Sequence, residues 1–449
     1  MDVPLREITE KFIFKRFAYS DFCTNFAAKT NLMRVLIVNT SEKKGGAAVA
    51  ANRLTEALIN NGVKAKMLVM EKQTQSIYVA SCVSRWWGML CFVLERLVIW
   101  ITNLFSRKNL YTVSIANTGN DITRTPEFRE ADVIHLHWVN QGFLSLRSLR
   151  KILDSGKPVV WTMHDMWPCT SICHYSYGCM RFRDDCGECP FLRFPGRHDL
   201  SWRVMKKKAR LMKGRRIHMV AVSNWLADQA RQSAVTKYQN ISVIPNALSL
   251  SHFHVISRSN SRELLALPDD RKIIVFGAAC VDAPIKGLHY LLDAVQLLID
   301  RKVFRREQLY LVLFGGIKDE AVLQRIPIDH SYLGFVDEDD LSAIYSAANV
   351  LVSSSLYETF GQTLIEAQAC GCIPVSFNNS GQRDIIDHKV NGYLADYKSV
   401  ESLADGLEWG LNADIPASQL RNNVIRKYSE SVVAKSYIEL YNQIAKTKA

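Results

Sequence analysis

Apolar residues follow two periods along the chain, one typical of buried strands and one of helices. Residues 34–39 form a short apolar run, and residues 47–58 are rich in helix formers at helical spacing. Asn61-Gly62 ends this helix, and residues 63–70 then have the pattern of a second strand. A strand, a helix and a strand in this order predict two parallel strands with a crossover helix.

The same alternation continues through the first half of the chain and starts again in the second. The first half predicts further strands at residues 131–135, 158–163, 217–222 and 241–244. After the polar stretch 249–270, which resembles a linker, the second half predicts a helix at 287–300 and strands at 271–276, 309–314, 332–336, 350–353 and 373–377. This pattern predicts an α/β protein with two doubly wound, Rossmann-like domains that face each other across a cleft.

The predicted elements divide the chain into four parts. These are an N-terminal extension (1–32), an N-terminal domain (33–246) with a cysteine-rich insert at about 169–190, a C-terminal domain (247–430) and a final helix (431–449). The extension has no clean period, so it is either an appended arm or Met33 is the true start. The final helix is long enough to cross back to the N-terminal domain.

Composition and charge narrow the function classes. The chain is 48% hydrophobic and 22% charged, which excludes a mainly disordered protein. Its net charge of +12 is concentrated in residues 181–216, where twelve Lys or Arg stand against four Asp or Glu. Such a stretch suits an anionic partner, whether nucleotide phosphate, lipid headgroup or nucleic acid. The first 30 residues have no uninterrupted apolar core, so we expect no signal peptide and a cytoplasmic protein with reduced thiols.

The segment 353–375 carries the strongest candidate chemistry. A strand ends at its serines, a loop holds Glu358, and a helix that starts near Gly361 carries Glu366 in its early turns. The first N–H groups of such a helix are unpaired and can hold an anion or sugar oxygens. The plain alternative is one surface glutamate and one that interacts with the helix dipole.

With Phe360-Gly361 between them, Glu358 and Glu366 resemble the E-x7-E motif of retaining GT-B glycosyltransferases of family 4. The resemblance implies that Glu366 binds the nucleotide ribose and Glu358 lies near the donor sugar. It also implies that the backbone amides between them hold sugar hydroxyls and phosphate. It extends from residue 34 to about 445.

Two blocks, residues 131–138 and 161–189, are most similar to bacterial enzymes of the colanic-acid type.

Three other places agree with this family. Gly45-Gly46 stands where the family has a glycine loop against the diphosphate, although a plain turn explains a glycine pair equally well. Lys286 matches the lysine that neutralises the diphosphate, and His164 matches a histidine that contacts the donor sugar, although a lone histidine is also compatible with a structural role. Many relatives also have an arginine ahead of the lysine. Residues 277–282 contain none, so the second positive charge is absent or comes from elsewhere.

The resemblance implies transfer of a hexose from a UDP-, GDP- or ADP-sugar to a saccharide or lipid-linked saccharide in surface polysaccharide synthesis. It implies a donor in the C-terminal domain, an acceptor in the N-terminal domain, and no required cofactor. The alternatives are a GT-B sugar-nucleotide epimerase and a non-catalytic, membrane-associated binder of sugar nucleotides. A Rossmann dehydrogenase needs G-x-G-x-x-G after the first strand, which residues 39–46 lack.

Four cysteines within seventeen residues could hold a structural zinc ion: Cys173, Cys179, Cys186 and Cys189. The last two have the two-residue spacing typical of zinc sites, whereas the gaps of five and six residues are less typical. Free loop thiols, a disulfide and an iron–sulfur cluster are the alternatives.

Two segments are candidates for a membrane surface. Residues 86–105 are long enough to span a bilayer, but Glu95-Arg96 at the centre makes spanning costly. A helix packed on the sheet and an interfacial helix with tryptophans at the headgroups are the other interpretations.

The basic run 203–216 is either a solvated helix face or a face toward anionic lipid. No nucleic-acid fold signature accompanies it, so we expect no nucleic-acid partner. A peripheral position on the inner face of the plasma membrane is therefore the alternative to a freely cytoplasmic protein.

Overall fold

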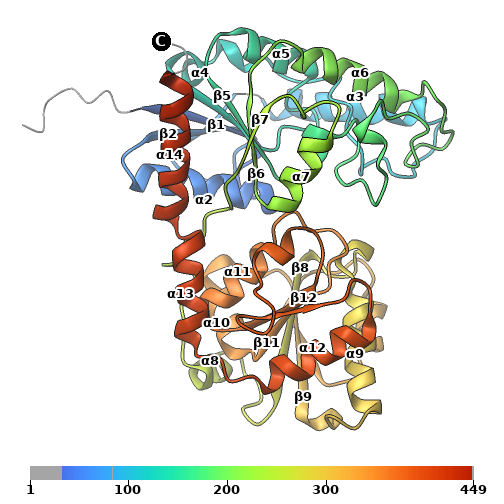
Figure 1. The fold of residues 1–449 in the computed structure, drawn as a ribbon, viewed down its shortest axis with the longest axis vertical. Coiled ribbons are helices and arrows are strands. Elements are labelled where there is room, and N and C mark those ends of the chain that lie inside the picture. Colours follow the sequence, from blue (N-terminus) through green and yellow to red (C-terminus); the bar gives the residue numbers. More distant parts are fainter. Residues whose placement is uncertain (1–32, 83, 447–449) are drawn as a thin grey trace, which may run out of the picture.

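The computed structural model describes residues 33–82 and 84–446 and has two α/β lobes, one above the other in Figure 1. The predicted extension, residues 1–32, lies outside the described residues. Each lobe has its own parallel sheet covered by helices on both faces, which confirms the predicted fold class.

The N-terminal sheet has seven strands in the order β3-β2-β1-β4-β5-β6-β7. The strands are β1 (Arg34–Ser41), β2 (Lys64–Glu71), β3 (Val79–Ser81), β4 (Val133–Leu136), β5 (Val159–Met163), β6 (His218–Ala221) and β7 (Asn240–Val243). The helices of this lobe are α2 (Gly46–Asn60), α3 (Arg85–Thr102), α4 (Pro126–Glu130), α5 (Leu146–Asp154), α6 (Leu200–Met212) and α7 (Asn224–Gln232). Strands β1, β4 and β5 are buried almost throughout, because helices cover both faces and no solvent-facing side remains to require alternation.

The C-terminal sheet has six strands in the order β10-β9-β8-β11-β12-β13. The strands are β8 (Lys272–Cys280), β9 (Leu309–Gly316), β10 (His330–Tyr332), β11 (Val350–Ser353), β12 (Ile373–Phe377) and β13 (Tyr393–Ala395). The helices are α8 (Arg258–Leu264), α9 (Leu288–Asp300), α10 (Glu338–Ala347), α11 (Gln362–Ala369), α12 (Val400–Asn412) and α13 (Ala417–Tyr428).

Two sequence-based predictions in this lobe were wrong. Residues 249–270, predicted as a linker, contain α8, which Arg262 anchors by donating a hydrogen bond from Nε to the Ala347 carbonyl at 3.0 Å. Because α8 packs through polar groups, its sequence lacks the apolar stripe that identifies a helix. Of the apolar run 332–336, only Tyr332 belongs to a strand.

The last helix, α14 (Glu430–Lys446), leaves the C-terminal lobe and packs against the N-terminal sheet, as the red ribbon in Figure 1 shows. Tyr437 and Tyr441 are buried in one apolar cluster with residues of β1. The Tyr441 hydroxyl lies 2.7 Å from His135 Nδ1, and the Tyr437 hydroxyl lies 2.9 Å from Thr162 Oγ1. The chain therefore connects the two lobes both at its middle and at its end.

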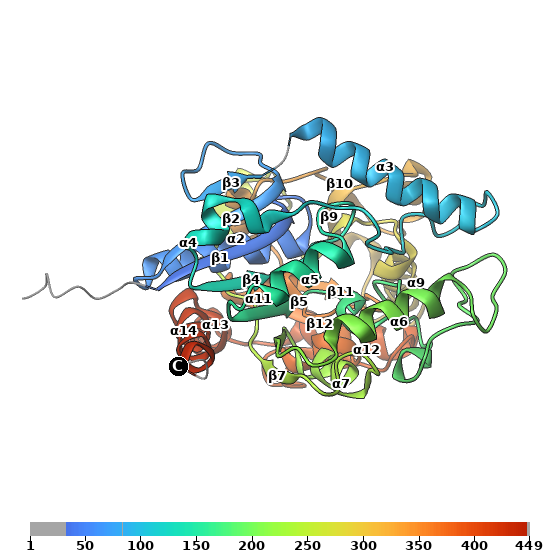
Figure 2. The same ribbon diagram turned by 90° about the horizontal axis from the view of Figure 1, so that it is seen from above.

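Helix α3 lies along one side of the N-terminal lobe, as Figure 2 shows, and its buried Ile99 shares an apolar cluster with Val204 of α6. Its charged pair faces inward: Glu95 is buried and accepts the N–H groups of Ile115 and Ala116, both at 2.8 Å, while Arg96 donates to the Val113 carbonyl at 2.9 Å. Most of the large apolar side chains of α3 are exposed, whereas Cys91 and Ile99 are buried. In the described part of the chain, every helix falls short of what a bilayer-spanning helix requires.

Candidate active site

A cavity of about 640 Å³ lies between the two lobes. Its walls come from the carboxyl ends of strands in both sheets, including Asn39 of β1, His164 after β5, Ala278 of β8 and Ser353 of β11. Ligands of open α/β sheets bind at this edge. The cavity is therefore the expected place for a substrate.

All predicted catalytic and donor-binding residues except Glu366 line this cavity: Gly45, Gly46, His164, Lys286, Glu358, Phe360 and Gly361. They come from both lobes and from separate places in the sequence. The N-terminal lobe supplies the glycine pair at the start of α2, and the C-terminal lobe supplies the start of α11 opposite. The Gln362 side chain connects these two helix starts by donating a hydrogen bond to the Gly46 carbonyl at 3.4 Å.

The loop between β11 and α11 brings Glu358 and the first turn of α11 to the cavity. Gly361, which immediately precedes α11, has φ 111°. A Cβ at this position would lie 2.9 Å from Leu364 Cδ1, so a larger residue would meet both backbone strain and a close contact. Glycine thus permits the sharp entry that aims the unpaired N–H groups of the helix toward the cavity.

Lys286 ends a 3₁₀ turn (Pro284–Lys286) that follows β8. Gly287, with φ 67°, allows this turn to approach β11, because a Cβ there would lie 2.2 Å from the Ser354 carbonyl oxygen. Lys286 Nζ lies 2.8 Å from Glu358 Oε2, and both side chains are partly buried. The structure therefore places one ammonium group and one carboxylate side by side at the cavity wall.

Glu366 lies behind the cavity wall, and only 5% of it is exposed. Its Oε1 accepts a hydrogen bond from Arg53 Nη2 at 2.9 Å, and its Oε2 accepts one from the Tyr345 hydroxyl at 3.1 Å. Arg53 belongs to α2 of the other lobe. The structure thus brings Glu358 and Lys286 together, whereas it places the Glu366 carboxylate in the interface between the lobes and outside the cavity lining.

His164 lines the cavity directly after β5. Its Nε2 lies 2.8 Å from His137 Nδ1, and its carbonyl accepts a hydrogen bond at 2.7 Å from Thr359 Oγ1 of the other lobe. Burial lowers the pKa of His164 to about 4, even though Asp165 opposes this shift. The imidazole is therefore neutral at pH 7 and can hydrogen-bond a sugar hydroxyl without adding charge.

The sequence-based reasoning missed a polar cluster beside His164. Asp165 Oδ2 accepts hydrogen bonds from Trp138 Nε1 at 2.7 Å and His174 Nδ1 at 2.6 Å. Burial opposes ionisation of Asp165, but the charge and hydrogen bond of His174 outweigh it, so the pKa of Asp165 lies below its ordinary value. All three residues line the cavity. The signal that could have found them is the His-Asp pair directly after a buried strand.

Lys44, which precedes the glycine pair, also lines the cavity. Its Nζ pairs with Glu71 Oε1 at 2.5 Å in an exposed position. Lys44 is a candidate for the second positive charge that residues 277–282 do not contain.

The four clustered cysteines, Cys173, Cys179, Cys186 and Cys189, line one small cavity of about 20 Å³. All are free thiols, and burial raises the pKa of Cys173 and of Cys186 to about 12. In the described residues, no three His, Cys, Asp or Glu side chains already surround one point as metal ligands would. The structure therefore gathers the predicted thiols without closing a metal site.

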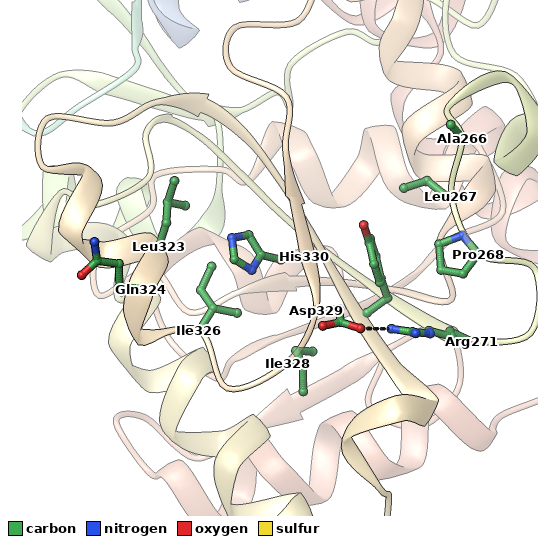
Figure 3. A pocket seen from close by; sticks show the side chains of 11 residues that line it. Ala266, Leu267, Pro268, Arg271, Leu323, Gln324, Ile326, Ile328, Asp329 and His330 are labelled. Carbon is green, nitrogen blue, oxygen red and sulfur yellow. Dashed lines mark hydrogen bonds and ion pairs between the residues drawn. The ribbon is translucent and has the colours of Figure 1, made fainter.

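A larger hollow of about 840 Å³ lies in the C-terminal lobe, away from these residues (Figure 3). It is lined by residues at the amino ends of β8, β9 and β10, among them Arg271, Tyr310 and His330. Arg271 pairs with Asp329 across it at 2.5 Å, as the dashed line in Figure 3 shows. The hollow is open and lies at the sheet edge opposite the ligand-binding one, so it is not a candidate active site.

Family models match both lobes. The model described as Glycosyltransferase Family 4 matches residues 44–252, and the model described as Glycosyl transferases group 1 matches residues 257–427. Together they span nearly all of the described chain.

Curated relatives and solved structures agree with these matches. The chain is 28% identical to an uncharacterised glycosyltransferase of Methanocaldococcus jannaschii over 50% of its own length and 59% of the relative's. It is 24% identical to an uncharacterised 41.2 kDa protein in the cps region of Klebsiella pneumoniae over 89% of its own length and 96% of the relative's. The structure of Anabaena HepE in complex with UDP and glucose matches with a TM-score of 0.58 and 15% identity, covering 92% of this chain and all of that one. At that identity the match shows the fold alone.

Proposed function

The chain belongs to the GT-B glycosyltransferases of family 4, and we propose that it transfers a hexose from a nucleoside-diphosphate sugar to a saccharide or lipid-linked saccharide acceptor with retention of configuration. The observation that carries this proposal is the Lys286–Glu358 pair in the cleft, between the glycine loop of one lobe and the start of α11 in the other. The relative in the cps region favours a role in surface polysaccharide synthesis.

The donor would lie against the C-terminal lobe with its diphosphate near Lys286. As the glycosidic bond breaks, negative charge develops on the leaving diphosphate. That charge would be stabilised by Lys286, by the backbone N–H groups of Gly45 and Gly46, and by the N-terminus of α11, all of which border the cavity. Anabaena HepE, which shares the fold, was solved in complex with UDP and glucose, and this supports a sugar nucleotide as the donor class.

The acceptor would enter from the N-terminal lobe and attack the face of the sugar that the diphosphate leaves. In this front-face mechanism the leaving phosphate accepts the proton of the acceptor hydroxyl, so no enzyme nucleophile is needed. Glu358 would lie near the donor sugar, and the neutral His164 would hold one of its hydroxyls. The lobes meet around the cavity and would exclude the water that otherwise hydrolyses the donor.

Product analysis tests this proposal against its alternatives. A thermal-shift panel of UDP-, GDP- and ADP-sugars first identifies the base, and the radiolabelled donor is then incubated with saccharide and lipid-linked acceptors. Transfer with the anomeric configuration of the donor is the expected result. An epimerised sugar nucleotide without transfer would favour the epimerase, and binding without any turnover would favour the non-catalytic binder.

Peripheral contact with an anionic membrane is part of the proposal, and it rests on α3. Eight large apolar side chains of α3 are exposed: Trp86, Trp87, Met89, Leu90, Val93, Leu94, Leu97 and Ile101. Exposed Arg107 and Lys108 follow the C-terminal end of α3. Arg193 is a third cation at this end, because its backbone N–H donates to Asn103 Oδ1 at 2.6 Å. An apolar stripe next to cations matches acyl chains next to anionic headgroups. The basic run 203–216, much of which lies in α6, is a second candidate for this contact, since Val204 of α6 and Ile99 of α3 belong to one apolar cluster.

The α3 surface also leads to the cleft. Tyr111 stacks on Phe92 of α3, with 6.5 Å between ring centroids, and Tyr111 lines the cavity. A membrane-held acceptor at this surface would therefore enter the cavity from the N-terminal lobe.

We expect replacement of Trp86, Val93 and Leu97 by serine to reduce partitioning onto vesicles of phosphatidylcholine and phosphatidylglycerol by about tenfold or more, because three exposed apolar side chains are lost. Vesicle sedimentation measures this. Tyr238→Ser and Leu264→Ser, which remove exposed apolar side chains elsewhere, are the matched controls. Unchanged partitioning would contradict the proposal. It would also be contradicted if the wild-type protein were a dimer and the α3 variant a monomer, because the exposed side chains of α3 would then form a dimer interface.

Structural zinc at the four thiols remains a proposal. Cys173, Cys179, Cys186 and Cys189 line one small cavity, and their thiolates are ligands that zinc prefers. Nearby Lys208 is buried, and its Nζ donates to the carbonyl oxygens of Trp167 at 2.6 Å and Thr170 at 3.1 Å. Burial lowers the pKa of Lys208 to about 7. A zinc ion with four thiolates carries a net negative charge, which would favour the protonated form of this lysine.

Metal analysis of the purified protein is expected to give about one equivalent of zinc, with Cys186→Ser and Cys189→Ser lowering both the zinc content and the midpoint of thermal unfolding. Cys82→Ser, outside the cluster, is expected to leave both unchanged. Less than about a tenth of an equivalent in wild-type protein purified without chelator would argue against zinc.

A further inference from the structure

A buried arginine of the N-terminal lobe reaches into the C-terminal lobe. Arg53 lies on the third turn of α2, and its guanidinium is held between two glutamates. Nη2 lies 2.6 Å from Glu338 Oε1 and 2.9 Å from Glu366 Oε1, and Nε lies 2.9 Å from the same Glu338 oxygen. Its Cζ also lies 4.9 Å from the centre of the Phe253 ring. These contacts join the lobes directly behind the cavity.

The charge of Arg53 is needed at this position. Burial by itself would lower the pKa of Arg53, but Glu366 and Glu338 outweigh it and raise that pKa above the ordinary value. The side chain of Glu338 is 40% exposed and can be hydrated, whereas that of Glu366 is 7% exposed. Without Arg53, Glu366 would be a buried, uncompensated carboxylate whose remaining partner is the Tyr345 hydroxyl, which destabilises this arrangement.

The guanidinium and the carboxylate also keep capacity for a ligand. Each oxygen of Glu366 has one hydrogen bond in the described structure, and a carboxylate oxygen can accept two. Arg53 Nη1 is buried and has no hydrogen-bond partner among the described residues. The pair therefore keeps hydrogen-bonding capacity beyond the bonds that hold it.

We propose that Arg53 is a positioning residue, which fixes the Glu366 carboxylate for the donor ribose and so makes donor binding depend on contact between the lobes. This inference rests on the proposed function and on the family resemblance, which implies that Glu366 binds the ribose. It explains why Glu366 is oriented by a residue of the opposite lobe. The Glu366 carboxylate has the orientation that binds ribose only when α2 lies against α11. Arg53 itself takes no part in the bond-breaking step.

Binding and kinetics of four variants test this role. For Arg53→Gln we expect the Kd for the nucleoside diphosphate and the KM for the donor to rise about 10-fold to 100-fold, because a hydrogen-bonded charge is lost, while kcat changes far less. Arg53→Lys is expected to recover part of the loss, since it keeps the charge. Glu366→Gln is expected to raise KM similarly, and the double variant Arg53→Gln/Glu366→Gln should be no worse than the more affected single variant.

Two comparisons separate this role from a merely structural one. Arg231→Gln removes an arginine from an exposed pair with Asp228, and it is expected to leave KM unchanged. Folding is followed by thermal unfolding, because a structural role alone would lower the midpoint without a selective change in KM. A folded Arg53→Gln variant with wild-type donor KM, or strictly additive effects with Glu366→Gln, would overturn the inference. If wild-type protein binds no UDP, GDP or ADP, the proposed function fails as well; if it binds one and Arg53→Gln binds it equally, only the role of Arg53 fails.

Discussion

Replacing Lys286 with alanine is expected to lower kcat by about 10²-fold to 10³-fold, with a much smaller change in donor KM. Lys286 lines the cavity, and in the proposed function the charge of the leaving diphosphate develops beside it as the glycosidic bond breaks. An interaction that strengthens in the transition state contributes to kcat, whereas one that is equally strong in the ground state contributes to KM. Single-turnover transfer with saturating donor measures the chemical step directly.

The partner of Lys286 sharpens this experiment. Because Nζ lies 2.8 Å from Glu358 Oε2, removal of the lysine also leaves Glu358 without its cation. Lys286→Arg keeps the charge and is expected to retain more activity than Lys286→Ala. Lys318→Ala removes an exposed lysine of the same lobe and serves as the matched control. Turnover of Lys286→Ala equal to that of the wild type would show that the diphosphate is stabilised by other groups.

The sequence predicts best those parts of the molecule whose structure depends on residues close together in the chain. Glu358 and Gly361 are three residues apart, and one strand–loop–helix junction fixes them, so the spacing alone places both at the cavity. The strands were found for a similar reason, since a strand buried on both faces is a continuous apolar run. Lys286 was placed by resemblance, and the turn that Gly287 permits explains its position.

Contacts between distant residues could not be predicted in this way. Arg53 and Glu366 are 313 positions apart, and nothing in either local sequence indicates that α2 meets α11. The orientation of α3 was equally hidden, because a mid-helix Glu95-Arg96 pair is compatible with an exposed polar side or with an inward-facing one. Only Ile115 and Ala116, whose N–H groups Glu95 accepts, decide between these orientations.

Acidification from pH 7 to pH 5 is expected to lower the free energy of unfolding by about 2 kcal/mol for each buried histidine of the N-terminal lobe that stays neutral in the folded protein. His135 lies between Thr162 Oγ1 and the Tyr441 hydroxyl, each at 2.7 Å, and burial lowers its pKa to about 3. Burial, and then the neighbouring histidines, hold the pKa of His137 well below 6.5. His135 is therefore neutral in the folded protein at pH 5, and burial disfavours protonation of His137 as well.

The direction of this effect follows from proton binding. Above pH 6.5 these histidines are neutral in both the folded and the unfolded chain, so they add no pH dependence. As the pH falls below 6.5, they take up protons only in the unfolded chain, which is stabilised by about 2 kcal/mol per histidine at pH 5. Urea unfolding at several pH values measures the slope. His135→Gln, whose amide can replace both hydrogen bonds, is expected to reduce this pH dependence by about 2 kcal/mol, whereas His252→Gln, at a half-exposed position outside the sheet, is expected to leave it unchanged. A stability that stays constant from pH 7 to pH 5 would mean that these imidazoles accept protons within the folded sheet, and the bonds from His135 to Thr162 and α14 would then need to rearrange.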